Sequence, residues 1–253
     1  MLISVTDLAA YLYCPRTLYM RKVLGYEEEF KEQMLLGAIR HKLYDAVNKA
    51  EGEVVKGING FVTRDSLTAN YRGFYLGTLK GVIAKHEKAL QFFEIAPEEA
   101  AATIIPSIVA DADLRAENIH NFLSTHKVFG DELWLRLMPK ILTEVKAKSE
   151  RLKLIGSVDR VELYPDSVVP VELKTGKLPS ERTWLAHRMQ IAAYMLLLRE
   201  KFQLPITSGR VLYLDHNVAK NVFTNPFLEF EVIDTTNKVI ELLQSNKLPA
   251  QCG

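Results

Sequence analysis

The chain has 253 residues, of which 48% are hydrophobic and 25% charged, and its formal net charge is +1. This composition is ordinary for a soluble globular protein, and the near-neutral charge excludes a uniformly basic surface for nucleic acid. No apolar run approaches the roughly 20 residues that span a bilayer, and the N-terminus lacks the basic and apolar regions of a signal peptide. We therefore expect a cytoplasmic protein with no membrane partner, in which any nucleic-acid site depends on local positive charge.

The first half of the chain is predicted to be mostly helical. Ser4 or Thr6 is a suitable N-cap for a first helix, and Pro15 ends that helix because the residue before a proline avoids the helical conformation. The mostly helical block from about Tyr75 to Lys140 is expected to form an annex that covers one edge of a sheet. Helices are predicted over residues 16–24, 31–50 and most of 75–140, whereas 53–61 and 73–81 contain glycines and fit either helix or strand.

The second half mixes the two periodicities, which favours an α/β fold. Alternating or continuous apolar runs predict strands over residues 141–149, 152–164, 168–174, 210–215 and 227–232, and helical spacing predicts helices over 179–201 and 235–245.

Residues 156–174 predict a β-hairpin that carries acidic and basic side chains on an apolar face. Its turn is Pro165-Asp166-Ser167, which has the residue types that tight turns prefer. Folding the chain about this turn places Asp159 opposite Glu172, with their Cβ atoms roughly 5 Å apart. Lys174 lies two residues beyond Glu172 and therefore shares its face.

Two facing carboxylates raise each other's pKa unless a cation joins them, and hard oxygen ligands select Mg²⁺ or Mn²⁺. A lysine beside such an ion can orient an attacking water or stabilise developing charge. The alternative is a solvated Asp–Lys–Glu surface on an edge strand, because this pattern is common by chance. Glu144, on the preceding strand, either adds to the metal site or pairs with a neighbouring lysine, and we favour the pairing.

Two further elements carry polar side chains of interest. His187, Gln190 and Tyr194 share one face of the helix predicted over 179–201 and would point into the same cleft. The alternative is a helix with a mixed polar edge. His41 lies in the helix predicted over 31–50, where its simplest interpretation is a helix-face histidine with a solvent or backbone partner.

Several short motifs follow one another along the chain, from residue 14 to residue 252. They are Cys14-Pro15-Arg16, Gly37 with His41, Asp159, Glu172-Leu173-Lys174-Thr175-Gly176, Gln190 with Tyr194, and Cys252. Any one of these motifs is weak, but the ordered set resembles the RecB-like branch of the PD-(D/E)XK nucleases. Within that branch it most resembles the iron–sulfur exonucleases of the CRISPR-associated Cas-four family.

The resemblance implies a restriction-endonuclease-like fold, with a mixed central sheet, flanking helices and the helical annex. It implies one nuclease domain over residues 1–253, with a mostly helical region over 1–140 and the nuclease core over 141–253. It also implies roles for single residues. Asp159, Glu172, Lys174, Gln190 and Tyr194 match catalytic positions, while His41, Asp159, Glu172 and the backbone carbonyl of Leu173 match the ligands of Mg²⁺ or Mn²⁺.

Cys14 and Cys252 match cysteines that hold an iron–sulfur cluster in the family. A [4Fe–4S] cluster takes four thiolates, and this chain has two cysteines. We therefore expect that the sequence stops short of the remaining cluster segment after Cys252, and the alternative is that this member has lost the cluster. Without a cluster, Cys14 is interpreted as a small buried hydrophobic residue.

The resulting hypothesis is a metal-dependent DNA exonuclease acting on single-stranded ends, with a role in CRISPR spacer acquisition. One alternative is a DNA-binding subunit that recognises a short flanking motif within an integrase complex. Another is a stand-alone or helicase-associated repair nuclease, whose motor would be a separate chain because this one contains no P-loop motif. Phosphate contacts are expected from Lys146, Lys148, Arg151, Lys153, Lys177, Arg182 and Arg188, and DNA contacts also from Gln190 and Tyr194.

Overall fold

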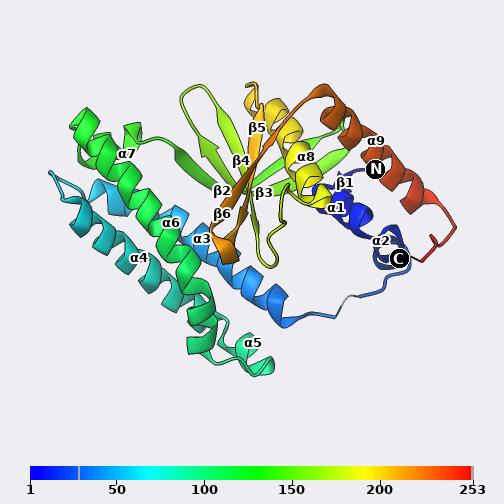
Figure 1. Ribbon diagram of the computed structural model, residues 1–253, viewed down its shortest axis with the longest axis horizontal. Coiled ribbons are helices and arrows are strands. Elements are labelled where there is room, and N and C mark those ends of the chain that lie inside the picture. Colours follow the sequence, from blue (N-terminus) through cyan, green and yellow to red (C-terminus); the bar gives the residue numbers. More distant parts are fainter. Residues whose placement is uncertain (28, 252–253) are drawn as a thin grey trace. The chain divides into compact units, whose positions relative to one another are not determined.

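The structure is a computed structural model that describes residues 1–27 and 29–251 (Figure 1). The chain forms two compact units. The sheet unit consists of Met1–Glu29, Ile141–Leu214 and Val218–Gly253, and the helical unit consists of Phe30–Lys140 with Asp215–Asn217. The description of residues 1–253 as one nuclease domain, divided at residue 140, stays a prediction.

The sheet unit is built on a mixed six-stranded sheet. Its strands are β1 Ile3–Ser4, β2 Lys140–Ser149, β3 Leu154–Leu163, β4 Val168–Lys174, β5 Ser208–Tyr213 and β6 Val218–Phe223. The order is β1-β3-β4-β5-β6, and β2 also pairs with β3. The pairs β3–β4 and β5–β6 are antiparallel, whereas β1–β3 and β4–β5 are parallel. This mixed sheet with flanking helices confirms the predicted α/β architecture.

Four helices accompany the sheet: α1 Val5–Tyr13, α2 Pro15–Lys22, α8 Leu185–Phe202 and α9 Pro226–Gln244. Helix α8 packs against β3, β4 and β5 and is itself contacted by α1 and α9 (Figure 1). Every side chain of α8 from Met189 to Leu198 is buried. A helix that is enclosed on all sides has no solvent face, so its polar residues Gln190 and Tyr194 must find partners inside the core.

The helical unit contains α3 Glu32–Lys56, α4 Arg64–Lys85, α5 Glu87–Phe92, α6 Pro97–His126 and α7 Gly130–Arg136. Helices α4 and α6 lie side by side over much of their length, and α3 contacts both of them and α7. The expectation of helix over most of 75–140 is confirmed. Of the two glycine-containing segments that fit either helix or strand, 53–61 is helical as far as Lys56, where α3 ends, and 73–81 lies within α4.

A buried ion pair joins α3 to α6 inside the helical unit. The Arg115 guanidinium donates to both carboxylate oxygens of Glu51, with N–O distances of 2.5 and 3.0 Å, and the two side chains are 4% and 3% exposed. The Tyr71 hydroxyl donates to Glu51 at 3.3 Å, and Arg115 also donates to the carbonyl of Pro139 at 3.0 Å. The charges are thus both paired and hydrogen-bonded, as buried charges require.

The register of the central hairpin agrees with the sequence analysis. Arg160 pairs with Val171 and Leu163 pairs with Val168, which is the alignment predicted from the turn. The break between the first two helices is also confirmed. Ser4 caps α1, and Cys14, ahead of Pro15, adopts an extended conformation with φ −159° and ψ 107°.

The strand predicted over 227–232 is wrong, because these residues form the first turns of α9. The Asn225 side chain caps this helix by accepting from the Leu228 amide, and Pro226 occupies its first position. Leu228 and Val232 are buried at helical spacing, whereas Phe227 and Phe230 are 86% and 69% exposed. Leu228, Phe230 and Val232 alternate with two glutamates, which gives this segment an apparent period of two.

Two further differences from the prediction concern the start of α8 and strand β6. Helix α8 begins at Leu185 rather than at 179, and the loop before it is held by the Lys220 ammonium, which donates to the carbonyls of Pro179 and Glu181. Strand β6, which the sequence analysis missed, follows Asn217, a residue with a left-handed φ of 51° that makes the tight turn from β5. Exposed and less exposed residues alternate along this short strand, but its sequence does not alternate between polar and apolar residue types.

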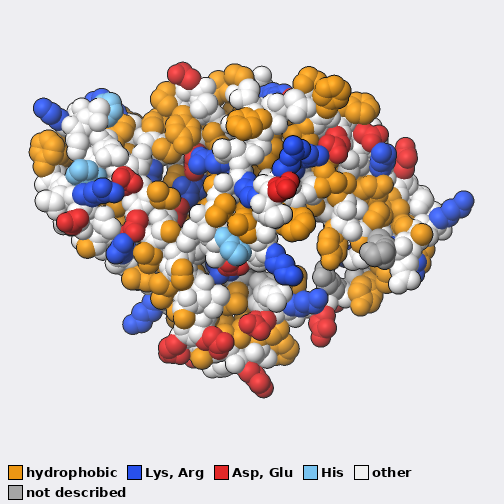
Figure 2. Space-filling view, viewed as in Figure 1, with side chains coloured by type: hydrophobic (Ala, Val, Ile, Leu, Met, Phe, Trp, Pro, Cys, Tyr) orange, Lys and Arg blue, Asp and Glu red, His pale blue; other side chains and the backbone are white. Residues whose placement is uncertain are grey.

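Charged side chains of both signs are interspersed over the face shown in Figure 2, as the net charge of +1 leads one to expect. The described part of the chain includes no helix long and apolar enough to cross a bilayer.

Candidate active site

Asp159 on β3 and Glu172 on β4 lie at neighbouring positions of the central hairpin. The carboxylate of Asp159 accepts a hydrogen bond from the Leu173 amide at 2.8 Å, so it is tied to the backbone beside Glu172. Asp159 is half-buried, and Glu172 is only 4% exposed. The alternative of a solvated acidic surface does not fit this burial.

Glu172 is the centre of a hydrogen-bonded cluster. Its Oε1 atom accepts from the Lys174 ammonium at 2.8 Å and from the Gln190 amide at 2.6 Å. The Gln190 nitrogen also lies 3.4 Å from the Tyr194 hydroxyl, and Gln190 and Tyr194 are each 2% exposed. The structure therefore brings Glu172, Lys174, Gln190 and Tyr194 together, on one face of the hairpin and one face of α8.

The electrostatics of the cluster resemble those of a site that binds a cation. Burial raises the pKa of Asp159 to about 6, and nearby Glu144 raises it further, against the opposing effects of the Leu173 amide and Lys174. Burial, followed by the charge of Glu172, raises the pKa of Tyr194, so its hydroxyl stays protonated. Burial disfavours the ionised form of Asp159, and the nearby Glu144 carboxylate adds repulsion. A divalent ion bound beside these groups would stabilise their ionised forms.

His187 also belongs to this region. Burial, followed by the charge of Lys174, lowers the pKa of His187 to about 4, so its imidazole is neutral at physiological pH. Its Nδ1 atom lies 3.1 Å from the Tyr213 hydroxyl. The polar stripe predicted on this helix therefore points toward β4 and β5 rather than forming a solvent-exposed edge.

Glu144 on β2 lies with the acidic residues. Its Oε2 atom accepts from the Ser157 hydroxyl at 3.1 Å, and one of its carboxylate oxygens lies within 4.8 Å of one of Asp159. The chain at Glu144 has a left-handed φ of 52°, which is uncommon for a residue other than glycine. These contacts support the alternative that the sequence left open, in which Glu144 adds a third carboxylate to a metal site. Carboxylate oxygens in this number suit Mg²⁺ or Mn²⁺.

The other residues predicted to bind the metal ion or the iron–sulfur cluster are His41, Leu173, Cys14 and Cys252. The side chain of His41 is half-buried on α3 in the helical unit, and its role as a ligand stays a prediction, as does that of the Leu173 carbonyl. Cys14 is 9% exposed between α1 and α2, and Cys252 lies outside the described residues. Two cysteines do not supply the four thiolates of a [4Fe–4S] cluster, so the residues present do not fit that group.

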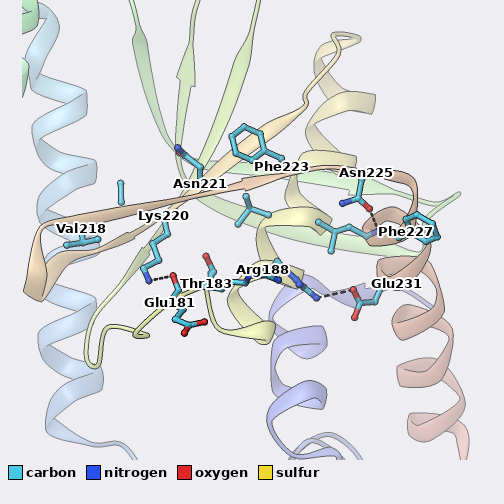
Figure 3. A pocket seen from close by; sticks show the side chains of 14 residues that line it. Glu181, Thr183, Arg188, Val218, Lys220, Asn221, Phe223, Asn225, Phe227 and Glu231 are labelled. Atoms are coloured by element: carbon cyan, nitrogen blue, oxygen red, sulfur yellow. Dashed lines mark hydrogen bonds and ion pairs between the residues drawn. The ribbon is translucent and has the colours of Figure 1, made fainter.

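Two of the arginines expected to contact DNA lie along a groove of about 760 Å³ beside β6 and the start of α9 (Figure 3). Arg182 and Arg188 both line it, and Arg188 pairs with Glu231 at 3.3 Å. Lys177 is exposed in the loop between β4 and α8. Contacts of these side chains with DNA stay a prediction.

Comparison with known proteins identifies the family to which the chain belongs. Residues 2–247 match the family model described as the PD-(D/E)XK nuclease superfamily. The chain belongs to this superfamily. The resemblance inferred from the order of the motifs is therefore confirmed, together with the fold class.

Individual relatives of this PD-(D/E)XK protein fall into two groups. A DNA replication ATP-dependent helicase/nuclease, JHS1 of Arabidopsis thaliana, is 21% identical over 230 residues, which is 87% of this chain and 16% of that protein. The CRISPR-associated exonuclease Cas4 of Rhodospirillum rubrum is 42% identical over 59 residues, or 22% of this chain and 18% of that protein. A Cas4/endonuclease Cas1 fusion from the same organism is 46% identical over 54 residues, or 21% of this chain and 9% of the fusion. The chain thus spans less than a fifth of each of these relatives.

Sequence reasoning missed two residues that shape the candidate site. Ser157 holds Glu144 through its hydroxyl, and a serine in a strand gives no signal of such a role. Gly156 lies against Tyr194, and a Cβ atom added there would be 2.7 Å from Cε1 of that ring and 3.1 Å from a methyl group of Val5. A glycine within a strand often marks such a close approach, so this residue could have been found from the sequence.

We expect Gly156→Ala to destabilise the protein by about 1–3 kcal/mol, because the new methyl group must displace the Tyr194 ring or the backbone. Cleavage activity should fall as well, since Tyr194 contacts Gln190, which holds Glu172. Thermal unfolding and nuclease assays measure both effects. Gly77→Ala is the control, because Gly77 lies in α4 with nothing within 4 Å of an added Cβ. Equal stability of the two variants would contradict this packing argument.

Proposed function

We propose that this PD-(D/E)XK protein is a Mg²⁺- or Mn²⁺-dependent deoxyribonuclease that acts as an exonuclease on single-stranded DNA ends. The observation that carries the proposal is the cluster of Asp159, Glu172 and Lys174. Gln190 donates a hydrogen bond to Glu172 and contacts the Tyr194 hydroxyl. Buried carboxylates beside a lysine are costly for a protein that only binds DNA, because they repel the phosphate backbone. They are useful for a protein that hydrolyses it.

In this mechanism Asp159 and Glu172, with Glu144 and the Leu173 carbonyl, would hold the ion. When bound there, such an ion would supply Lewis acidity, which would lower the pKa of a water and offset charge on the phosphate. Lys174, whose ammonium lies 2.8 Å from Glu172, orients the attacking water or stabilises charge that develops on the phosphate. Gln190 fixes the orientation of Glu172 by donating to it, and Tyr194, which stays protonated, remains available as a donor.

Binding of Mn²⁺ should weaken as the pH falls below about 6. The pKa of Asp159 is raised to about 6 in the metal-free protein, so a proton competes with the ion for this carboxylate below that pH. We expect the apparent Kd to rise by up to about tenfold per pH unit below 6 and to change little from this group above 7. Calorimetric titration at pH 7.5 and 5.0 measures it, with thermal melts in EDTA to verify that the protein stays folded. An unchanged Kd would contradict the assignment of Asp159 as a ligand.

The exonuclease assignment is tested by comparing linear with circular single-stranded DNA of the same sequence in Mn²⁺. An exonuclease requires an end and should degrade only the linear form. Strands labelled at the 5′ or the 3′ end then report the polarity from the order in which label is released. Cleavage of the circle would show an endonuclease and overturn this part of the proposal.

For the biological setting, we propose spacer acquisition together with CRISPR integrase subunits. The matches to an exonuclease named Cas4 and to a Cas4/endonuclease Cas1 fusion support this setting. The longer match to a plant helicase/nuclease favours a second candidate, a repair nuclease that works with a separate helicase. A third candidate is a DNA-binding subunit of the integrase complex. Co-purification with integrase subunits, followed by a nuclease assay of the complex, separates the three.

A further inference from the structure

A second groove lies in the sheet unit, between the turn that joins β2 to β3 and the C-terminal end of α8. We name it the β2–β3 groove. Its volume is about 990 Å³, and its lining includes Lys146 and Lys148 on β2, Arg151 in the turn, Ser157 on β3 and Lys201 on α8. The proposed roles of Asp159, Glu172 and Lys174 do not involve the β2–β3 groove.

The β2–β3 groove is basic although the whole chain is almost neutral. Among the described residues that line it, four cationic side chains face one carboxylate, Glu200. That carboxylate is engaged by the Arg151 guanidinium at 2.5 and 2.9 Å, and Lys148 pairs with Glu150 at 2.7 Å. Cations exceed anions along the groove, which is the charge complement of a phosphodiester backbone.

The groove adjoins the candidate active site through Ser157, which lines the groove and contacts Glu144. The Ser157 hydroxyl donates to Glu144, and Glu144 in turn lies within 4.8 Å of Asp159. Gly156, the next lining residue, rests against the Tyr194 ring. A strand bound in this groove would therefore pass beside Ser157, next to Glu144.

Two of the cations that line the groove lie on the same face of β2. Lys146 and Lys148 are both exposed and lie two residues apart, so they share one face of the strand and are spaced by about 6.6 Å. This spacing is of the order of that between successive phosphates on one strand. Ile155, 41% exposed in the groove lining, adds apolar surface that a base can cover.

We propose that the β2–β3 groove binds the phosphates of a single DNA strand on one side of the bond that is cleaved. This inference rests on the proposed nuclease function and extends it by giving the path of the strand. Lys146 and Lys148 contact successive phosphates, Arg151 is held toward the strand by Glu200, and Ser157 marks the end of the path nearest the carboxylates.

The test compares Lys148→Glu with Lys238→Glu. Both lysines form exposed ion pairs of similar length, 2.7 Å to Glu150 and 2.6 Å to Asp234, with 53% and 55% exposed side chains, so the two variants differ in location and not in charge. Each is assayed in Mn²⁺ on a DNA strand of about 30 nucleotides and on the p-nitrophenyl ester of thymidine 5′-phosphate. The ester is too short to occupy the groove and reports the chemistry of the site alone.

We expect Lys148→Glu to raise KM for the long strand at least fivefold, and Lys146→Glu combined with Lys148→Glu to raise it further. Hydrolysis of the small ester should stay within twofold of the wild type, as should both activities of Lys238→Glu. Higher salt should reduce the difference between the variants, because fewer counterions are released by the reversed site. Equal KM values for Lys148→Glu and Lys238→Glu on the long strand would overturn the proposal.

Failure of the nuclease function is distinguishable from failure of the groove. If the wild type cleaves neither substrate, the proposed function is wrong, and the groove is judged by fluorescence anisotropy of the labelled strand in EDTA. Weaker binding of Lys148→Glu than of Lys238→Glu in that assay supports the groove as a DNA site. Equal binding overturns it.

Discussion

Replacing Asp159 with asparagine should abolish metal-dependent cleavage and, at the same time, stabilise the metal-free protein. Asparagine keeps an oxygen that accepts from the Leu173 amide but removes the negative charge that an ion would bind. We expect cleavage to fall by roughly three orders of magnitude. Removing this half-buried anion, whose pKa is raised in the folded protein, should raise the free energy of unfolding at neutral pH by about 1–2 kcal/mol, or a few degrees in Tm.

The stability gained by Asp159→Asn depends on pH. The pKa of Asp159 is about 6 in the folded protein and 3.8 ordinarily, so the folded state binds the proton more tightly than the unfolded state. The ionised carboxylate therefore destabilises the fold fully above pH 6, and that cost is relieved as the pH falls toward 4. The gain in Tm from Asp159→Asn should be present at pH 8 and absent near pH 4, measured in EDTA.

Glu172→Gln provides the matched control for this effect. Glu172 already has a counter-ion in Lys174, so removing its charge leaves that lysine without its partner and should bring no gain in stability. Both variants should lose cleavage, but only Asp159→Asn should melt at a higher temperature than the wild type. If Asp159→Asn melts at or below the wild type at pH 8, Asp159 does not carry the electrostatic cost that we assign to it.

The second large effect is expected in the helical unit, where Arg115→Met should destabilise the protein by about 3–5 kcal/mol. The substitution leaves the Glu51 carboxylate buried beside Tyr71 without its guanidinium. An uncompensated buried charge is far more costly than the loss of a surface pair. Thermal and urea unfolding, followed by a helix signal, measure the loss as a fall in Tm of roughly 6–20 °C.

Arg72→Met is the control for burial, because Arg72 forms a similar two-pronged pair with Asp113, at 2.6 and 2.7 Å, on the surface of the same unit. It should leave Tm almost unchanged, since exposed pairs contribute little. Combining Glu51→Met with Arg115→Met should recover much of the loss, because neither charge remains buried. If Arg115→Met and Arg72→Met have the same effect, the burial of the pair does not matter for stability.

The central hairpin was the most predictable part of the fold. Its register follows from a local turn and the two-residue period of strands, and both act over fewer than 20 residues. Asp159, Glu172 and Lys174 could therefore be placed on one face before any tertiary contact was known. Gln190 and Tyr194 were placed together because they lie four residues apart on one helix.

Other features depend on contacts between distant parts of the chain and could not be predicted. The segment 227–232 alternates like a strand, and it is the cap at Asn225 and the burial of Leu228 and Val232 against the core that make it helical. Glu144 joins the carboxylates because β2 pairs beside β3, which sets its distance from Asp159. The β2–β3 groove likewise exists only because the end of α8 packs near the turn at Arg151.

We propose that Asp159 and Glu172 hold the metal ion of a nuclease site. A time course on end-labelled linear single-stranded DNA, with Mn²⁺ or with EDTA, tests this proposal by comparing the wild type with Glu172→Gln. We predict degradation by the wild type in Mn²⁺ alone and none by the variant under either condition. Full activity of Glu172→Gln in Mn²⁺ would contradict the proposal.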